Sequence, residues 1–212
     1  MTLIKYPRTP HLPYSEGVGS NDKILEDDSI FTDKEVVVTT KMDGENTTIY
    51  STGFSHARSL NSIHRSYHSW LLSYVPTISY KIPNGYRLCG EYLYAQHSIK
   101  YNDLNSYFLA FSLWNDNNIC VSWQEFEEFC LKNNIFCVPI LYKGKYNANI
   151  IENIAKNAII NGQEGIVVRN IDAFHYTDFN KNVAKYVRKN HVQTDEHWSL
   201  STITTNSLKK EI

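Results

Sequence analysis

A lysine follows a short β-branched run, and this is where the chain could carry out covalent chemistry. Residues 35–40 read EVVVTT, which predicts a buried strand, and KMDG follows at residues 41–44. An amine is nucleophilic only when neutral, and a pKa of about 10.4 leaves about one Lys in 2,500 neutral at pH 7. Lys41 therefore needs burial or nearby cations to lower its pKa. Asp43 raises the pKa of Lys41 unless a metal ion neutralises it, so a nucleophilic Lys41 would indicate a metal–nucleotide substrate. Taken alone, KMDG is more typical of an exposed lysine beside an Asp-Gly turn.

Later segments place further charged side chains next to apolar, strand-like runs. Glu91 lies in LCGEYLYA, and a carboxylate there is costly unless a ligand or a neighbour such as Arg87 partners it. Glu164 begins EGIVVR, so a carboxylate directly precedes another apolar run. Residues 181–191 hold four cations and no acid, and this basic patch could contact phosphates.

Taken in order, these segments resemble the covalent nucleotidyltransferase superfamily of polynucleotide ligases and mRNA capping enzymes, and most closely its RNA ligase family. The resemblance spans about residues 35–190 and rests on KMDG at 41–44, LCGEYLYA at 88–95, YFLAFSLW at 107–114, EGIVVR at 164–169 and VAKYVR at 183–188. Each motif is degenerate, and their shared order gives the resemblance its weight.

The resemblance implies an ATP-dependent RNA ligase. Lys41 would attack the α-phosphorus of ATP, release pyrophosphate and hold AMP as a phosphoramide, with Mg²⁺ or Mn²⁺ as the cofactor. The AMP would pass to an RNA 5′-phosphate, and a 3′-hydroxyl would then displace it and seal the strand. The implied partners are ATP and RNA ends.

The resemblance also assigns roles to residues. It makes Lys41 catalytic and Glu164 the metal ligand, and it places the nucleotide against Thr40, Lys41, Asn46, Arg58, Glu91, Phe111, Glu164 and Lys185. Glu91 would accept hydrogen bonds from the ribose, Phe111 would stack on adenine, and Lys185 would neutralise the α-phosphate. RNA contacts are expected from Lys181, Arg188 and Lys189. The sequence departs from the family at Ser112, where many relatives have an acid, and at Val187, where they have a second lysine.

Three alternatives stay open. The domain could be a GTP-using capping guanylyltransferase, a DNA ligase, or a non-catalytic module that binds RNA ends. About 20 residues follow Val192, too few for the second domain of many relatives. We therefore expect that the domain works alone, that a partner protein supplies the missing substrate contacts, or that activity stops at nucleotide transfer.

The elements that must position these residues read as an α+β fold. Strands are expected at residues 35–40, 47–50, 87–95, 107–114, 136–142, 165–169 and 183–188, and helices at 62–75, 124–133 and 148–160. Because strands and helices do not alternate strictly, we expect an antiparallel-sheet nucleotidyltransferase domain, of the ATP-grasp-like ligase adenylation type, with helices outside and no OB-fold. The expected divisions are a lead-in at 1–34, this domain at 35–192 and a peripheral tail at 193–212.

Composition narrows the class of protein. The 212 residues carry a formal net charge of −1, which excludes a uniformly basic coat but not a local basic groove. The four Cys include no C-x-x-C pair, so zinc ribbons and thioredoxin-like motifs are excluded. No leader or membrane span is evident, and we expect a cytoplasmic protein, in the host cytoplasm if the source is a virus.

Overall fold

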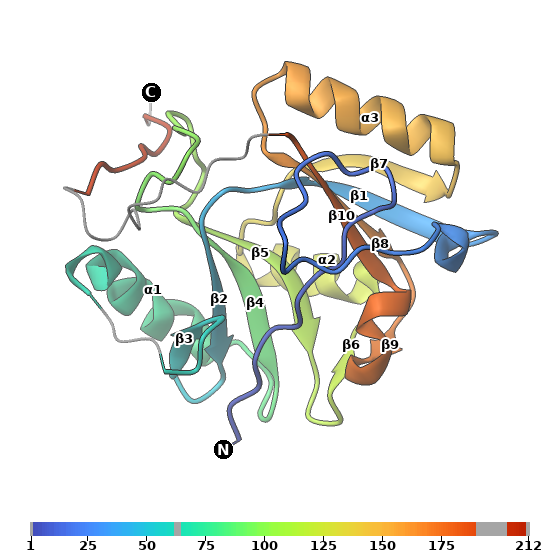
Figure 1. Cartoon of the computed structure of the whole chain (residues 1–212). Helices are drawn as coiled ribbons and strands as arrows, with labels where there is room; N and C mark the ends of the chain where they lie inside the picture. The colour runs from blue at the N-terminus through green and yellow to red at the C-terminus, as the bar shows by residue number, and fades with distance from the viewer. Residues whose placement is uncertain (1, 62–64, 190–202, 211–212) are drawn as a thin grey trace.

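The turn after the first strand joins two sheets, and this junction sets the position of Lys41. The computed structural model describes residues 2–61, 65–189 and 203–210. In it, β1 (Glu35–Lys41) belongs to a four-stranded sheet of order β10-β8-β1-β7, and β2 (Glu45–Tyr50) to a six-stranded sheet of order β3-β2-β4-β5-β6-β9 (Figure 1). All strand pairs are antiparallel. Residues 42–44 therefore carry the chain from one sheet to the other directly after Lys41.

The other elements complete these two sheets and cover them. The remaining strands are β3 (Ser55–Ala57), β4 (Arg87–Tyr92), β5 (Phe108–Trp114), β6 (Ile119–Cys120), β7 (Ile140–Lys145), β8 (Gly165–Asn170), β9 (Phe174–His175) and β10 (Val183–Val187). The helices are α1 (Ser69–Ser79), α2 (Trp123–Asn133) and α3 (Ala148–Ile160), with 3-10 turns η1 (Ser29–Phe31), η2 (Ser66–His68) and η3 (Tyr176–Lys181). The expected mixture of antiparallel strands and outer helices is confirmed.

Strand β1 is buried on both faces. Val36 and Val38 pack in one core with Ile151 and other residues of α3, whereas Val37 packs in the core of the six-stranded sheet. The four-stranded sheet thus lies between α3 and the six-stranded sheet, which explains the uninterrupted β-branched run. Since side chains alternate along a strand, Lys41 shares the face of Val37 and points between the sheets.

Two expected elements are placed differently. The helix predicted at 62–75 is α1, which begins at Ser69 and continues past Pro76 to Ser79. Residues 62–64 of the predicted helix lie outside the described residues. The turn η2 precedes α1 because the His68 ring is hydrogen-bonded to the Arg65 amide and to the Glu45 carboxylate, each at 2.8 Å. A tertiary contact thus overrides the helical pattern.

The strand predicted at 136–142 is also wrong in its bounds. Strand β7 begins only at Ile140, and the residues before it contact β5 instead, where the Val138 N–H donates to the Ala110 carbonyl at 2.9 Å. Pro139 lacks an N–H and separates the two pairings, while its carbonyl accepts the Thr40 N–H at 2.9 Å.

Both terminal segments are integrated into the fold. The chain from Pro10 to Leu12 runs parallel to β10, and Lys185 bonds both ends of this stretch through its backbone. The expectation that the C-terminal residues are peripheral is wrong for Asn206, which is 2% exposed. The predicted domain boundaries stay predictions.

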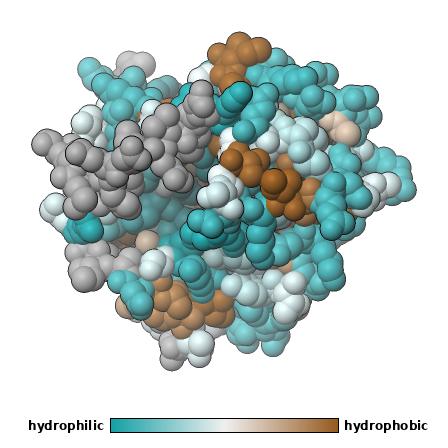
Figure 2. All heavy atoms as spheres, in the orientation of Figure 1, coloured by the Kyte–Doolittle hydropathy of each residue, from teal (hydrophilic) through white to brown (hydrophobic). Residues whose placement is uncertain are grey.

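The surface gives a further view of the molecule. Figure 2 shows that apolar side chains on this face gather in separate small patches within a mainly hydrophilic surface. No helix of the described residues is long and apolar enough to cross a membrane.

Candidate active site

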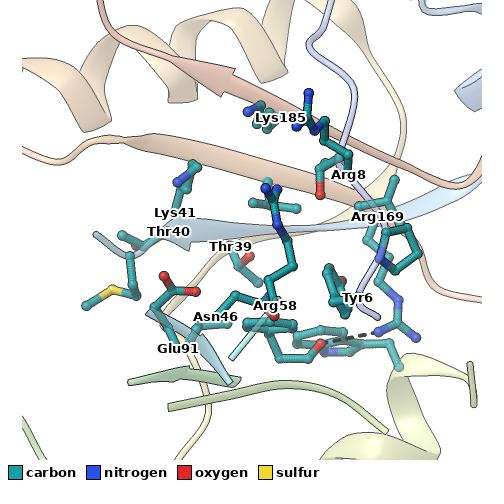
Figure 3. Close-up of a pocket in the computed structure, with 18 of the residues that line it drawn as sticks. Tyr6, Arg8, Thr39, Thr40, Lys41, Asn46, Arg58, Glu91, Arg169 and Lys185 are labelled. Atoms are coloured by element: carbon teal, nitrogen blue, oxygen red, sulfur yellow. Dashed lines mark hydrogen bonds between the residues drawn. The ribbon is translucent and has the colours of Figure 1, made fainter. Parts of the chain in front are cut away.

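A pocket of about 210 Å³ lies where the two sheets and the N-terminal segment meet (Figure 3). Lys41 lies at one end of it and Arg169 at the other in this view. The four-stranded sheet contributes side chains of β1, β8 and β10, the six-stranded sheet contributes Asn46, Glu91 and Phe111, and the N-terminal segment contributes residues 6–9 and Asp22. One pocket therefore collects residues from segments far apart in the sequence.

Lys41 forms a close ion pair with Glu164. Its Nζ lies 2.6 Å from both carboxylate oxygens, and the lysine side chain is 24% exposed whereas that of Glu164 is 4% exposed. The register of β1 on β8 explains the contact, because Lys41 lies opposite Gly165. Gly165 must be glycine, since a Cβ there would lie 1.9 Å from the Tyr186 carbonyl oxygen of β10. The Glu-Gly dipeptide thus brings β10 close and aims the carboxylate at the lysine.

The electrostatics of this end are dominated by acids. Burial lowers the pKa of Lys41, but the Glu164 and Glu91 carboxylates outweigh burial and raise it above the ordinary value. Burial, together with the neighbouring acids, raises the pKa of Glu91 to about 8 against the opposing effect of Lys41. Without a ligand, Lys41 is therefore a protonated amine held by Glu164 and is not yet a nucleophile.

Asp43 is held by the loop between β4 and β5. One of its carboxylate oxygens accepts the Ser98 N–H at 2.8 Å, the Ser98 hydroxyl at 2.7 Å and the Ile99 N–H at 2.8 Å. The Asp43 N–H donates to the Tyr101 hydroxyl at 2.9 Å, and the Gly44 N–H donates to Glu91 at 3.2 Å. The residues after Lys41 are thus fixed by a loop that the sequence interpretation did not assign to the site.

Lys185 supplies a second amine to the pocket. Burial and the nearby Lys41 ammonium lower its pKa, despite Asp22, whose carboxylate lies 3.8 Å from its Nζ. Arg58 follows β3 and is exposed, and Figure 3 shows it pointing toward the side of the pocket where Arg8 and Lys185 lie. These cations suit a polyphosphate, because several positive charges converge on one side of the pocket.

The opposite end of the pocket is aromatic. Tyr6 meets Phe111 edge to face, with ring centroids 5.2 Å apart. Arg169 donates to the Val121 carbonyl at 2.6 Å and lies 5.4 Å from the centre of the Trp123 ring. Within the part of the chain that the structure describes, four buried polar atoms of pocket residues have no hydrogen-bond partner, namely Thr40 Oγ1, Asn46 Oδ1, Trp123 Nε1 and Arg169 Nε. Aromatic rings together with unpaired donors and acceptors in one pocket suit a nucleobase.

The predicted nucleotide-binding residues come together. Those that line the pocket are Thr40, Lys41, Asn46, Arg58, Glu91, Phe111 and Lys185, and Glu164 joins them through Lys41. The residues predicted to bind RNA do not line it. Lys181 is exposed on η3 and pairs with Asp178 at 2.8 Å, Lys189 is exposed, and Arg188 follows β10 and donates its N–H to the Glu164 carbonyl. Their RNA contacts stay predictions.

Sequence reasoning missed several residues of the site. Tyr6, Arg8 and Asp22 lie in the Pro-rich lead-in, where no local pattern marks them as pocket residues. Trp123 is the first residue of α2 and reads as helix core. Arg169 was visible inside EGIVVR but received no role.

A comparison with models of protein families identifies the proteins to which this chain is related. The model of the RNA ligase family matches residues 34–187. This chain belongs to the RNA ligase family. The resemblance drawn from the five motifs is thereby confirmed. No curated protein matches the chain at a significant level.

Solved structures of RNA ligases share the fold. An archaeal ATP-dependent RNA ligase is similar over 87% of this chain and 48% of its own, with a TM-score of 0.63 and 16% identity. A Naegleria gruberi RNA ligase with pyrophosphate is similar over 90% of this chain and 62% of its own, with a TM-score of 0.56 and 18% identity. A mutant of the Naegleria enzyme with ATP and Mn gives the same TM-score at 17% identity, over 90% and 62% of the two chains. The chain spans about half the length of the archaeal ligase.

Proposed function

We propose that this RNA ligase domain transfers AMP from ATP to its own Lys41, passes it to an RNA 5′-phosphate and seals that end to a 3′-hydroxyl. The proposal rests on one observation above all. The Lys41 amine lies against Glu164 at one end of a pocket that is also lined by Glu91, Lys185 and, at its other end, aromatic side chains. A protein that only binds RNA ends needs no such nucleophile.

The first step follows from this geometry. The neutral Lys41 Nζ attacks the α-phosphorus of ATP, a phosphorus–nitrogen bond forms, and the bond from that phosphorus to the bridging oxygen breaks. Pyrophosphate leaves with the electron pair of that oxygen, and the proton lost by the amine passes to solvent or to a neighbouring carboxylate such as Glu164. Lys185 offsets the charge that builds on the α-phosphate. Phe111 and Thr40 hold the base, and Glu91 receives the ribose.

The residues fit a divalent metal ion bound together with ATP. The described residues contain no cluster of three His, Cys, Asp or Glu side chains that would bind a metal by themselves. Mg²⁺ and Mn²⁺ need no such cluster, because one or two carboxylates with phosphate oxygens and water suffice. Glu164 is the carboxylate that fits, since it already contacts a cation. A bound divalent ion would supply positive charge that offsets Glu164 and so favours the neutral form of Lys41.

The last two steps complete the ligation. An RNA 5′-phosphate oxygen attacks the phosphorus of lysyl-AMP, which restores the free amine. The 3′-hydroxyl then attacks the 5′-phosphate and releases AMP. Arg58 and Asn46, which line the same pocket as Lys41, would contact the incoming phosphate. A partner protein that supplies further RNA contacts stays a prediction, as does a cytoplasmic location.

The test is self-labelling with α-labelled ATP or GTP in Mg²⁺ or Mn²⁺, followed by a denaturing gel. We expect label from ATP in the wild type, none in K41A, and normal labelling in K156A, which removes an exposed lysine. Label from GTP alone would instead support a capping guanylyltransferase, and absence of any label would support an RNA-end binder. Offering 5′-phosphorylated RNA and the matching DNA then separates the two ligase classes, and sealing of DNA alone would overturn the proposal.

A further inference from the structure

Residues 203–210 return to the loop between β4 and β5 and bond to several points along it. The Gln96 N–H donates to the Thr204 carbonyl at 2.8 Å, the Leu104 N–H to the Ser207 carbonyl at 3.1 Å, and the Lys209 N–H to the Leu104 carbonyl at 2.9 Å. Figure 1 shows this C-terminal segment beside the loop. The segment lies beyond residues 34–187, which the family model matches.

Asn206 is the most connected residue of this segment. Its side chain donates to the Leu93 carbonyl at 2.7 Å and the Ala95 carbonyl at 3.4 Å, and it accepts the Tyr101 N–H at 2.8 Å. Its backbone N–H donates to the Tyr94 carbonyl at 2.9 Å, and its carbonyl accepts the Tyr107 hydroxyl at 3.1 Å. The residue is 2% exposed. An amide that joins both limbs of a loop through donors and acceptors fixes the loop's shape.

The loop between β4 and β5 also holds Asp43, which lies two residues after Lys41. Ser98 and Ile99 bond the Asp43 carboxylate, and the Tyr101 hydroxyl accepts the Asp43 N–H. Tyr101 is itself bonded by Asn206 at its own N–H and by the Ser207 N–H at its carbonyl. A continuous chain of contacts therefore runs from Asn206 through Tyr101 to the turn after Lys41.

We propose that Asn206 is a positioning residue for the adenylylation of Lys41. Most residues from Gln96 to Asn105 are exposed or only partly buried, so this loop has little apolar core to fix it. Hydrogen bonds from Asn206 supply that constraint, and Tyr101 passes it to Asp43. A small displacement of a reacting group is enough to slow a covalent step, since a 1 Å error can cost about 100-fold. Asn206 does not line the pocket, so the binding of ATP should change little.

The inference rests on the proposed function and is tested with two variants of the full chain. N206D keeps the size of the side chain but turns an oxygen toward the Leu93 and Ala95 carbonyls. Y101F removes only the hydroxyl that accepts the Asp43 N–H and keeps the ring. N105D is the matched control, because it makes the same chemical change on an exposed residue of the same loop.

Three measurements separate positioning from general damage. These are the rate of lysyl-AMP formation at saturating ATP, the KM for ATP, and the sealing of RNA that already carries a 5′-adenylate, which needs no attack by Lys41. We expect N206D and Y101F to slow lysyl-AMP formation at least about tenfold, with KM and sealing of the adenylated RNA changed less than about twofold. N105D should match the wild type. The double variant should be no slower than the more impaired single variant, because both changes break one chain of contacts.

The outcomes are distinct. Wild-type rates of lysyl-AMP formation in both variants would overturn the inference, as would an equal loss in all three measurements. Should N206D lose its cooperative unfolding transition, Y101F alone decides. A wild type that forms no lysyl-AMP would overturn the proposed function itself, and the inference with it.

Discussion

Replacing Glu164 by Gln should make the Lys41 amine more reactive in protein free of divalent metal. The carboxylate lies 2.6 Å from the Lys41 Nζ, and it is a main reason why the pKa of Lys41 is raised. An opposite charge at such a distance typically shifts a pKa by about 1–3 units. Glu91 offsets part of the change, because loss of the Glu164 charge lets Glu91 ionise more readily beside the lysine. We therefore expect the pKa of Lys41 to fall, and the labelling of Lys41 at pH 8 to increase by about tenfold.

A second ion pair provides the control. Lys156 lies 2.7 Å from Glu152 on α3, almost the same distance, but these side chains are 57% and 40% exposed. Solvent screens such a helical pair to about 0.3–0.5 kcal/mol. E152Q should accordingly change the reactivity of Lys156 by less than about threefold.

The assay is competitive labelling with a trace of acetic anhydride in EDTA, followed by mass spectrometry of the peptides that carry Lys41 and Lys156. Thermal unfolding confirms that each variant is folded before labelling. An increase at Lys41 in E164Q no larger than that at Lys156 in E152Q would refute the view that Glu164 holds Lys41 protonated.

Three further predictions concern neighbouring groups. Because the pKa of Glu91 is raised to about 8, the folded protein keeps a proton that the unfolded chain releases. Between pH 5 and pH 8 the free energy of unfolding of the wild type, measured in urea, should therefore fall by on the order of 3 kcal/mol relative to that of E91Q. Parallel pH profiles of the two proteins would contradict this. Burial and the Lys185 ammonium lower the pKa of His11 to about 4, so His11 takes up a proton at higher pH in the unfolded chain than in the folded protein. As the pH falls from 7 to 4.5, the free energy of unfolding of the wild type should fall by on the order of 2 kcal/mol relative to that of H11Q. Equal losses in the two proteins would show that His11 does not titrate this way. F111L should raise the KM for ATP in lysyl-AMP formation about tenfold, because it removes the ring on which adenine stacks. The control is F136L, which removes an exposed ring outside the pocket. An unchanged KM in F111L would place the adenine elsewhere.

Much of the fold could be read from local pattern. Strand β1 was predicted to within one residue, because β-branched residues buried on both faces leave a continuous apolar run. Helix α2 was predicted to within one residue, and its cap is local, since the Ser122 hydroxyl accepts the Glu125 N–H at 3.2 Å. Helix α3 also has its expected bounds, 148–160. These features depend on residues close together in the chain, and such residues can be read directly from the sequence.

The elements that failed depend on distant residues. Helix α1 begins late because His68 bonds Glu45, which lies 23 residues earlier. Strand β7 begins late because the residues before Pro139 pair with β5 instead. Local pattern reports whether a segment can be buried, but it does not report which strand or side chain competes for its hydrogen bonds.

The chemistry of the site divides in the same way. The order of the motifs that hold Lys41, Glu91, Glu164 and Lys185 was sufficient to predict a nucleotide pocket, because it resembles the order found in the RNA ligase family. The close Lys41–Glu164 pair, the entry of Tyr6 into the aromatic end and the bonds of Asn206 could come only from the tertiary structure. Each joins residues about 100 positions or more apart, and the packing of the two sheets and of the terminal segments against them, rather than any local preference of the chain, brings those residues within bonding distance.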